Sequence, residues 1–260
     1  MEVRVVEAAR GWQWIVDGFA LFRKNPAMWI ALTIALALIW VVSLIVPLLG
    51  PLLFTLLTPV FFAGLMTGCR AVENSEPLEF QHLFAGFRQQ AAPLVTIGGV
   101  YLVGTVIVMG IVLMAAGGSM LPTVLSKGAG ADIETLRAAL RSLAIALAIG
   151  AAAYLPLIML IWFAPLLVIF GEMTPLAAMK LSFSACLRNT AAFLVYGLAI
   201  LVMWLVMSLP AAGGIIGSLL VAALLIASIP LLICSVYASY KDVFTAPRGA
   251  STPGGNPLLR

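Results

Sequence analysis

Charged side chains are scarce in this chain. Lysine, arginine, aspartate and glutamate together make up 9% of its 260 residues, whereas 63% of the residues are hydrophobic. A water-soluble domain of this length cannot hide so much apolar surface, so the composition excludes a soluble fold and indicates a chain dissolved in a bilayer. No acidic residue lies centrally in an apolar run, although proton relays and ion coupling usually require such a group.

Histidine and cysteine are also scarce, with one histidine and three cysteines. His82 stands close to Glu79 on the polar face of a short amphipathic segment. We interpret it as a headgroup-facing residue rather than a pH switch or a metal ligand, because a lone histidine lacks partner ligands. We interpret Cys69, Cys186 and Cys234 as packing residues whose thiols stay reduced.

The familiar motifs of catalysis are missing. The sequence contains no nucleophile elbow, zinc-protease helix or phosphate-binding loop, and it resembles no nucleic-acid module. The tyrosines Tyr101, Tyr154 and Tyr196 are the polar groups that an intramembrane enzyme could still use, but most such tyrosines serve packing. We therefore expect no enzyme activity, no catalytic residue, no cofactor, no metal site and no nucleic-acid partner.

Long apolar runs are what the chain does contain. Six uncharged stretches are each long enough for one membrane-spanning helix of about 20 residues. They cover roughly residues 27–46, 52–69, 93–116, 143–170, 191–209 and 217–240. Alternating ten-residue segments typical of a membrane barrel are missing from the sequence. The prediction is an all-α integral membrane protein with six transmembrane helices.

The basic residues predict the orientation. Of the fourteen lysines and arginines, three (Lys127, Arg137 and Arg141) fall on one side of the predicted spans and the other eleven, 14 minus 3, on the opposite side. The positive side faces the cytoplasm, so both termini are expected there. The first apolar run starts late and is long enough to span, so we expect it to remain as an anchor rather than to act as a cleaved signal.

Amphipathic segments precede the first, third and fifth runs. In each, large apolar residues recur at helical spacing and an arginine follows them, which is typical of a helix lying on the membrane surface. The third segment is the weakest, and it opens with Pro175 as the expected first helical residue. Aromatic burial or the binding of a lipid headgroup or a partner could each explain the pattern. The predicted membrane-interface anchors are Trp12, Phe19, Phe22, Arg23, Phe84, Phe87, Arg88, Phe183 and Arg188.

These segments suggest an internal repeat. Aligning Phe19, Phe84 and Phe183 gives three units, each an interfacial helix followed by a transmembrane hairpin. The units cover about residues 6–73, 76–172 and 174–243 and form one predicted membrane domain over 1–243, followed by a disordered cytoplasmic tail over 244–260.

A proline falls within the second span of each unit. Pro59, Pro165 and Pro230 are expected to kink their helices. Such kinks could act as hinges or line a pore, but kinks that only shape packing are the commoner case in membrane helices.

Two stretches carry a resemblance to a known family. They are ARGWQWIVDGFALFRKNPAMWI and GPLLFTLLTPVFFAGLMTGCRAVENSEPLEFQHLFAGFR. With the six-span plan, they resemble a family of uncharacterised proteobacterial membrane proteins that is known by a Burkholderia locus tag. A more distant likeness of pattern is to bacterial proteins of the YciC type. The resemblance runs to about Val243; it implies a bacterial inner-membrane location and brings no activity.

Two classes of function stay open. The first is a non-enzymatic inner-membrane protein that organises lipids or assembles with an envelope partner, with the lipid bilayer, another membrane protein or a second copy as its partners. The second is a carrier or channel for a small apolar molecule or a lipid. Charged gates beside the prolines would favour the second class, and the sequence pattern does not place any there.

Overall fold

The computed structural model describes residues 2–115 and 133–244, and every regular element in these ranges is a helix. The predicted all-α class is therefore confirmed, whereas residues 245–260 of the predicted tail lie outside the described residues. The helices of the first half are α1 (Arg10–Phe22), α2 (Pro26–Ser43), α3 (Leu49–Glu73), η1 (Phe80–Phe84), α4 (Ala85–Gln89) and α5 (Ala91–Ala115). Those of the second half are α7 (Ile133–Ile161), α8 (Ala164–Gly171), α9 (Pro175–Arg188), α10 (Thr190–Ser208), η3 (Leu209–Gly213) and α11 (Gly214–Phe244).

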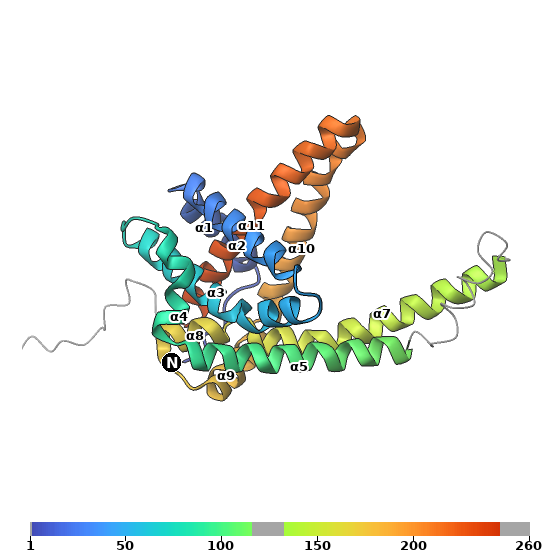
Figure 1. Cartoon of the computed structure of the whole chain (residues 1–260), viewed down its shortest axis with the longest axis horizontal. Helices are drawn as coiled ribbons and strands as arrows, with labels where there is room; N and C mark the ends of the chain where they lie inside the picture. The colour runs from blue at the N-terminus through green and yellow to red at the C-terminus, as the bar shows by residue number, and fades with distance from the viewer. Residues whose placement is uncertain (1, 116–132, 245–260) are drawn as a thin grey trace, which may run out of the picture. The chain divides into compact units, whose positions relative to one another are not determined.

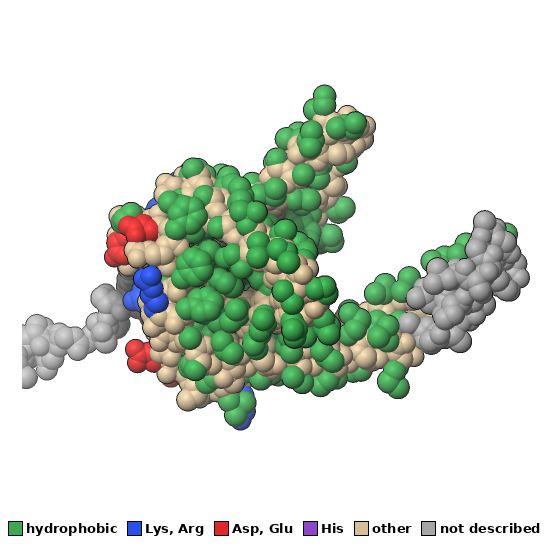
Figure 2. Space-filling model, viewed as in Figure 1, with side chains coloured by type: hydrophobic (Ala, Val, Ile, Leu, Met, Phe, Trp, Pro, Cys, Tyr) green, Lys and Arg blue, Asp and Glu red, His purple; other side chains and the backbone are tan. Residues whose placement is uncertain are grey.

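Five helical segments of the described chain are long and apolar enough to cross a membrane. They are Pro26–Ser43, Leu49–Glu73, Ala91–Ala115, Ile133–Gly171 and Thr190–Phe244. The last segment contains α10, the turn η3 and α11, and the two helices run beside each other as a hairpin (Figure 1). Figure 2 shows hydrophobic side chains along the visible face of this hairpin, as expected for helices surrounded by lipid.

The chain divides into two compact units that interleave in sequence. Unit 1 contains residues 1–34, 68–79 and 187–260, and unit 2 contains residues 35–67 and 80–186. Helices α2, α3 and α9 each run from one unit into the other. Sequence-distant segments therefore meet within each unit.

In unit 1, helix α1 packs against α10 and α11. Its buried side is formed by Gly11, Trp14, Ile15 and Gly18. The Trp14 ring lies 5.2 Å from the ring of Phe193 and 5.7 Å from that of Tyr196, both on α10. The glycines let the backbones approach closely, since a Cβ on Gly11 would lie 2.1 Å from the carbonyl oxygen of Ala192.

In unit 2, α5 and α7 lie side by side (Figure 1). A hydrogen bond of 2.6 Å joins the hydroxyls of Tyr101 on α5 and Tyr154 on α7. Helix α7 covers Ile133–Ile161, so the polar residues between 134 and 142 belong to the same helix as the fourth apolar run.

Two local features differ from the sequence prediction. The amphipathic segment before the third apolar run, residues 77–90, is expected to form a helix like the one before the first run, but residues 80–89 of it form the 3₁₀ turn η1 and the single-turn helix α4. Leu83 is buried there while Phe80, Phe84 and Phe87 are exposed, so tertiary packing around Leu83 outweighs the helical pattern.

Pro165 lies within the candidate span Ile133–Gly171, but that span contains a helix break that the sequence does not predict. Helix α7 ends at Ile161, and Pro165 instead lies in the first turn of α8. A proline there loses no helical hydrogen bond, because the first N–H groups of a helix have no partner within it. Pro59 and Pro230 do lie inside α3 and α11, whereas the proline inside α7 is Pro156. The kinks expected at Pro59 and Pro230 stay predictions.

Candidate functional site

Polar side chains of unit 1 gather where the ends of its helices meet. We call this cluster the polar end of unit 1; it consists of Arg10, Trp14, Glu73, Asn189, Tyr237, Lys241 and Asp242. Four of the seven can carry a charge in water, and each is held by a partner from a distant part of the chain. The cluster therefore joins helices that the sequence separates.

Asp242, in the last turn of α11, accepts two hydrogen bonds on one carboxylate oxygen. Arg10 Nε donates to its Oδ2 at 2.6 Å, and the indole nitrogen of Trp14 donates to the same atom at 2.9 Å. The hydrogen bond between Arg10 and Asp242 raises the pKa of the Arg10 guanidinium above its ordinary value, although burial acts in the opposite direction. The pair of charges therefore fixes the start of α1 on the end of α11.

Asn189 joins the amino-terminal segment to the junction of α9 and α10. Its Nδ2 donates to the carbonyl oxygen of Arg4 at 2.9 Å, and its Oδ1 accepts from the backbone nitrogen of Val6 at 2.8 Å. The side chain is buried, and both halves of its amide are hydrogen-bonded to backbone groups of the amino-terminal segment. The backbone nitrogen of Arg4 in turn donates to the carbonyl oxygen of Val243 at 3.0 Å.

Glu73, the last residue of α3, binds two residues of α11. Its carboxylate forms an ion pair with Lys241 and accepts a hydrogen bond of 2.8 Å from the hydroxyl of Tyr237. One turn earlier on each helix, Cys69 and Cys234 face each other with their sulfur atoms 3.9 Å apart. We call this contact the α3–α11 seam.

Exposed phenylalanines form a second feature, in unit 2. The ring of the buried Phe61 on α3 lies 6.2 Å from the ring of Phe84 and 5.1 Å from that of Phe87. Phe80, Phe84 and Phe87 are 50%, 43% and 37% exposed. The exposed Arg88 follows directly. We call Phe80, Phe84, Phe87 and Arg88 the phenylalanine surface. The buried ring of Phe61 packs against two of its rings, those of Phe84 and Phe87.

The break between α7 and α8 is bridged by a serine. Ser182 on α9 donates its hydroxyl to the carbonyl oxygen of Met159 at 2.7 Å and accepts from the backbone nitrogen of Phe163 at 2.9 Å. These two backbone groups would form one ordinary helical hydrogen bond in an unbroken helix, so the hydroxyl is inserted into that bond. The fully buried Ser182 thus satisfies a helix break inside an apolar segment.

The three tyrosines considered for catalysis fall in different units. Tyr101 and Tyr154 pair with each other in unit 2, and Tyr196 in unit 1 shares a hydrogen bond of 2.5 Å with Ser235. Within residues 2–115 and 133–244, no group of three or more histidine, cysteine, aspartate or glutamate side chains is placed to hold a metal ion.

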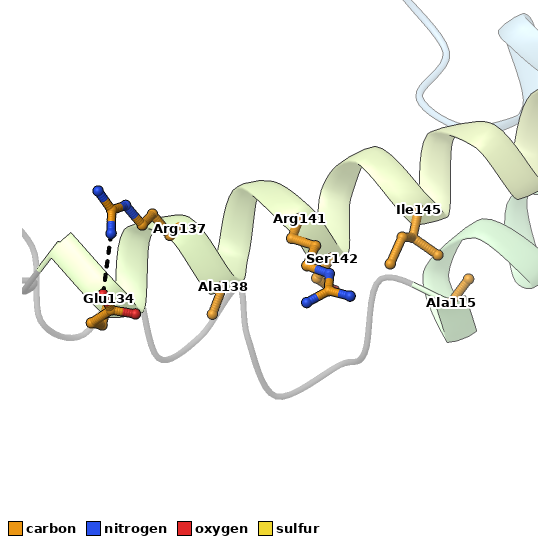
Figure 3. A pocket seen from close by; sticks show the side chains of 7 residues that line it. All are labelled: Ala115, Glu134, Arg137, Ala138, Arg141, Ser142 and Ile145. Carbon is orange, nitrogen blue, oxygen red and sulfur yellow. Dashed lines mark hydrogen bonds and ion pairs between the residues drawn. The ribbon is translucent and has the colours of Figure 1, made fainter.

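A shallow pocket of about 420 Å³ lies at the start of α7 (Figure 3). Arg137 in its wall pairs with Glu134 at 3.3 Å, and both side chains are exposed. Its other lining residues are Ala115, Ala138, Arg141, Ser142 and Ile145.

The predicted anchors fall in both units. Two of the nine are half-buried, Phe22 and Phe183. The exposed ones are Trp12, Phe19, Arg23, Phe84, Phe87, Arg88 and Arg188. Their place at a membrane interface stays a prediction. Sequence reasoning missed Trp14, Ser182, Asn189 and Asp242. Trp14 is apolar like its neighbours and gives no separate signal in the sequence, whereas the polar character of Ser182, Asn189 and Asp242 was the available signal.

The chain is similar to a curated bacterial membrane protein. Over 278 aligned residues, the chain is 32% identical to a probable inner membrane protein of Burkholderia thailandensis; the alignment covers 99% of this chain and 98% of the relative. No protein-family model matches the chain, and no solved structure matches it. The full-length match and the apolar helices support a multi-pass location in the inner membrane. The YciC-type likeness stays a prediction.

Proposed function

This chain belongs to the same family as the Burkholderia inner membrane protein, and we propose that it is a non-enzymatic six-span protein that organises phospholipids of the cytoplasmic leaflet. The carrying observation is the phenylalanine surface, where Phe84 and Phe87 are supported from beneath by Phe61 yet remain exposed beside Arg88. Rigid aromatic rings next to a cation suit the boundary between acyl chains and phosphates.

The proposal places one span in each of α10 and α11. Helix α10 contains 19 residues and α11 contains 31, and the turn η3 between them includes Pro210 and ends before Gly214, whose φ is +72°. Each helix is long enough to cross a bilayer of about 30 Å, so the hairpin accounts for two passes. The excess of lysine and arginine at the other ends of the spans supports cytoplasmic termini.

The three-repeat plan is part of the same proposal. Helices α1 and α9 and the η1–α4 segment each precede a pair of apolar helices, and each ends near an exposed arginine: Arg23, Arg88 or Arg188. The exposed Trp12 and Phe19 give α1 an aromatic face like that of the phenylalanine surface. Three such segments at one side of the membrane would bind several headgroups at once.

We favour anionic phospholipid over a protein partner as the ligand. A basic residue directly follows the aromatic residues in both of the stronger segments, as Arg23 follows Phe22 and Arg88 follows Phe87. Aromatic rings with a neighbouring arginine match the layered chemistry of a lipid, in which acyl chains lie next to a phosphate.

The test is native mass spectrometry of the detergent-purified chain after titration with phosphatidylglycerol or phosphatidylcholine. We expect retention of phosphatidylglycerol that falls severalfold in a Phe84→Ala/Phe87→Ala/Arg88→Gln variant. Arg137→Gln is the matched control, because Arg137 is also exposed but lies on the opposite side of the proposed spans. Equal retention in both variants would contradict the proposal, and co-purification of a defined membrane protein that the triple variant loses would replace lipid with a protein partner.

A carrier for a small apolar molecule or lipid is the second candidate. The observation that favours it is the break between α7 and α8 within one apolar segment, since broken helices often line binding sites in membrane carriers. In the same mass spectra, one defined small molecule that survives delipidation would support the carrier. In that case, Ser182→Ala should change the amount of the small molecule that stays bound, whereas the phenylalanine triple variant should not.

A further inference from the structure

Cys69 and Cys234 are paired across the α3–α11 seam. Their sulfur atoms lie 3.9 Å apart, although the two residues are 165 positions apart in sequence. Both side chains are fully buried and both thiols are free. Two free thiols at this distance can form a disulfide, because the sulfur atoms need to approach by only about 2 Å to reach the length of an S–S bond.

The surroundings of the pair hold the two helices in register. One turn nearer the helix ends, Glu73 on α3 binds both Lys241 and Tyr237 on α11. The third cysteine, Cys186, is also buried and lies in unit 2, where its sulfur contacts the carbonyl oxygen of Met159 at 3.8 Å. The chain therefore contains one facing thiol pair and one cysteine that serves as an internal control.

We propose that Cys69 and Cys234 form a redox modification site, at which a membrane-soluble quinone converts the two thiols to a disulfide that locks α3 to α11. Each thiol loses its hydrogen, and a new bond joins the two sulfur atoms. The two protons and two electrons released reduce the quinone to a quinol. The reaction reverses when a dithiol reductant restores both thiols.

The quinone class follows from the position of the pair. Both cysteines lie in apolar helices that belong to the candidate membrane spans, and neither side chain is exposed. An oxidant dissolved in the membrane reaches such a seam more readily than a charged oxidant in water. Since the thiols are buried, the reaction also requires the seam to open briefly, so its rate depends on the Glu73–Lys241 ion pair and the Tyr237 hydrogen bond.

The wild-type chain in isolated membranes tests the proposal directly. We would add ubiquinone-1, block remaining thiols with an alkylating reagent under denaturing conditions, and identify cross-linked peptides by mass spectrometry. The expected product links Cys69 to Cys234, weighs two hydrogens less than the two peptides, and disappears on reduction. Cys186 should remain alkylated in the same sample. If Cys69 and Cys234 are fully alkylated after treatment, the proposal is wrong.

Two comparisons complete the test. Cys186→Ser should leave the cross-link unchanged, whereas Cys69→Ser should remove it; a cross-link that requires Cys186 would overturn the site. Diamide, a diffusible two-electron oxidant, is tested in parallel. If diamide forms the cross-link and ubiquinone-1 does not, the two thiols can be oxidised but the proposal that a quinone is the oxidant is wrong.

The Glu73–Lys241 ion pair allows a further test, because the rate of cross-linking should depend on this ion pair only if the seam must open for the thiols to react. Lys241→Gln and Glu73→Gln should each raise the initial rate of cross-linking severalfold, because the seam then opens more often. Lys180→Gln is the matched control, since Lys180 is exposed on α9 in unit 2. An unchanged rate in both seam variants would contradict the dependence on seam opening.

Discussion

The indole nitrogen of Trp14 lies 2.9 Å from Oδ2 of Asp242, a hydrogen bond between residues 228 positions apart. It joins α1, the first helix, to the final turn of α11. Arg10 binds the same oxygen, so one carboxylate satisfies both a buried ring N–H and a cation. The consequences can be measured by changing one partner at a time.

Asp242→Ala should lower the stability of unit 1 by about 2 kcal/mol, since hydrogen bonds to charged groups contribute about 1.5–3 kcal/mol each and Arg10 is partly exposed. Asp242→Asn keeps an acceptor for Trp14 and should lower stability by less. The measurement is thermal unfolding in detergent. Asp17→Asn is the control, because its contact with Arg10 is long, at 3.6 Å, and both side chains are partly exposed. Equal losses for Asp242→Ala and Asp17→Asn would argue against the Asp242 hydrogen bonds as the cause.

Gly18→Ala should disturb the packing of α1 on α11. A Cβ at Gly18 would lie 2.6 Å from the backbone nitrogen of Ser235, and backbone cannot move aside as a flexible side chain can. Overpacking of this kind costs about 1–3 kcal/mol. The matched control is Gly197→Ala on α10, where nothing lies within 4 Å of the new Cβ. Limited proteolysis of α1 should speed up in the first variant and stay unchanged in the second.

Charge reversal tests the ion pair of the α3–α11 seam. Glu73→Lys and Lys241→Glu should each destabilise the chain by about 1 kcal/mol, because both side chains are partly exposed and solvent screens the interaction. The double variant, which swaps the two charges, should recover part of the loss in thermal unfolding. Additive losses in the double variant would indicate that the two side chains do not interact.

Ser182→Ala removes the hydroxyl that bridges the break between α7 and α8. The amide of Phe163 and the carbonyl of Met159 then each lose the hydrogen bond to Ser182, so we expect a loss of about 1–3 kcal/mol. Hydrogen exchange at the Phe163 amide should accelerate severalfold. Ser184→Ala, at a half-buried position of the same helix, is the control. Unchanged exchange at Phe163 would mean that α7 and α8 can close the bond directly.

The tyrosine pair of unit 2 predicts a non-additive effect. Tyr101→Phe or Tyr154→Phe leaves the partner hydroxyl without its 2.6 Å hydrogen bond, whereas the double variant removes both polar groups. We therefore expect the double variant to cost less than the sum of the single ones, with a coupling energy of about 0.6–1.7 kcal/mol. Thermal unfolding of the four proteins gives the coupling directly, and strict additivity would exclude the hydrogen bond as a source of stability.

Local sequence patterns predict where the helices lie better than they predict which residues of different helices contact each other. The start of α9 at Pro175 follows from a proline at the first helical position, and α1 follows from apolar residues at helical spacing. The same reasoning fails at residues 80–89, where the burial of Leu83 outweighs the helical pattern. It also does not reveal the break between α7 and α8, because the hydroxyl that bridges this break comes from Ser182 on another helix.

The sequence by itself determined that this protein is helical and multi-pass, because long uncharged runs must satisfy their backbone hydrogen bonds internally in lipid. Only the tertiary structure decided which polar groups meet. Asp242 and Trp14, or Cys69 and Cys234, occupy ordinary positions in their own helices and become a pair when two helix faces pack. Many packings satisfy the same pattern of apolar and polar residues, so the spacing along one helix does not identify the partner on another.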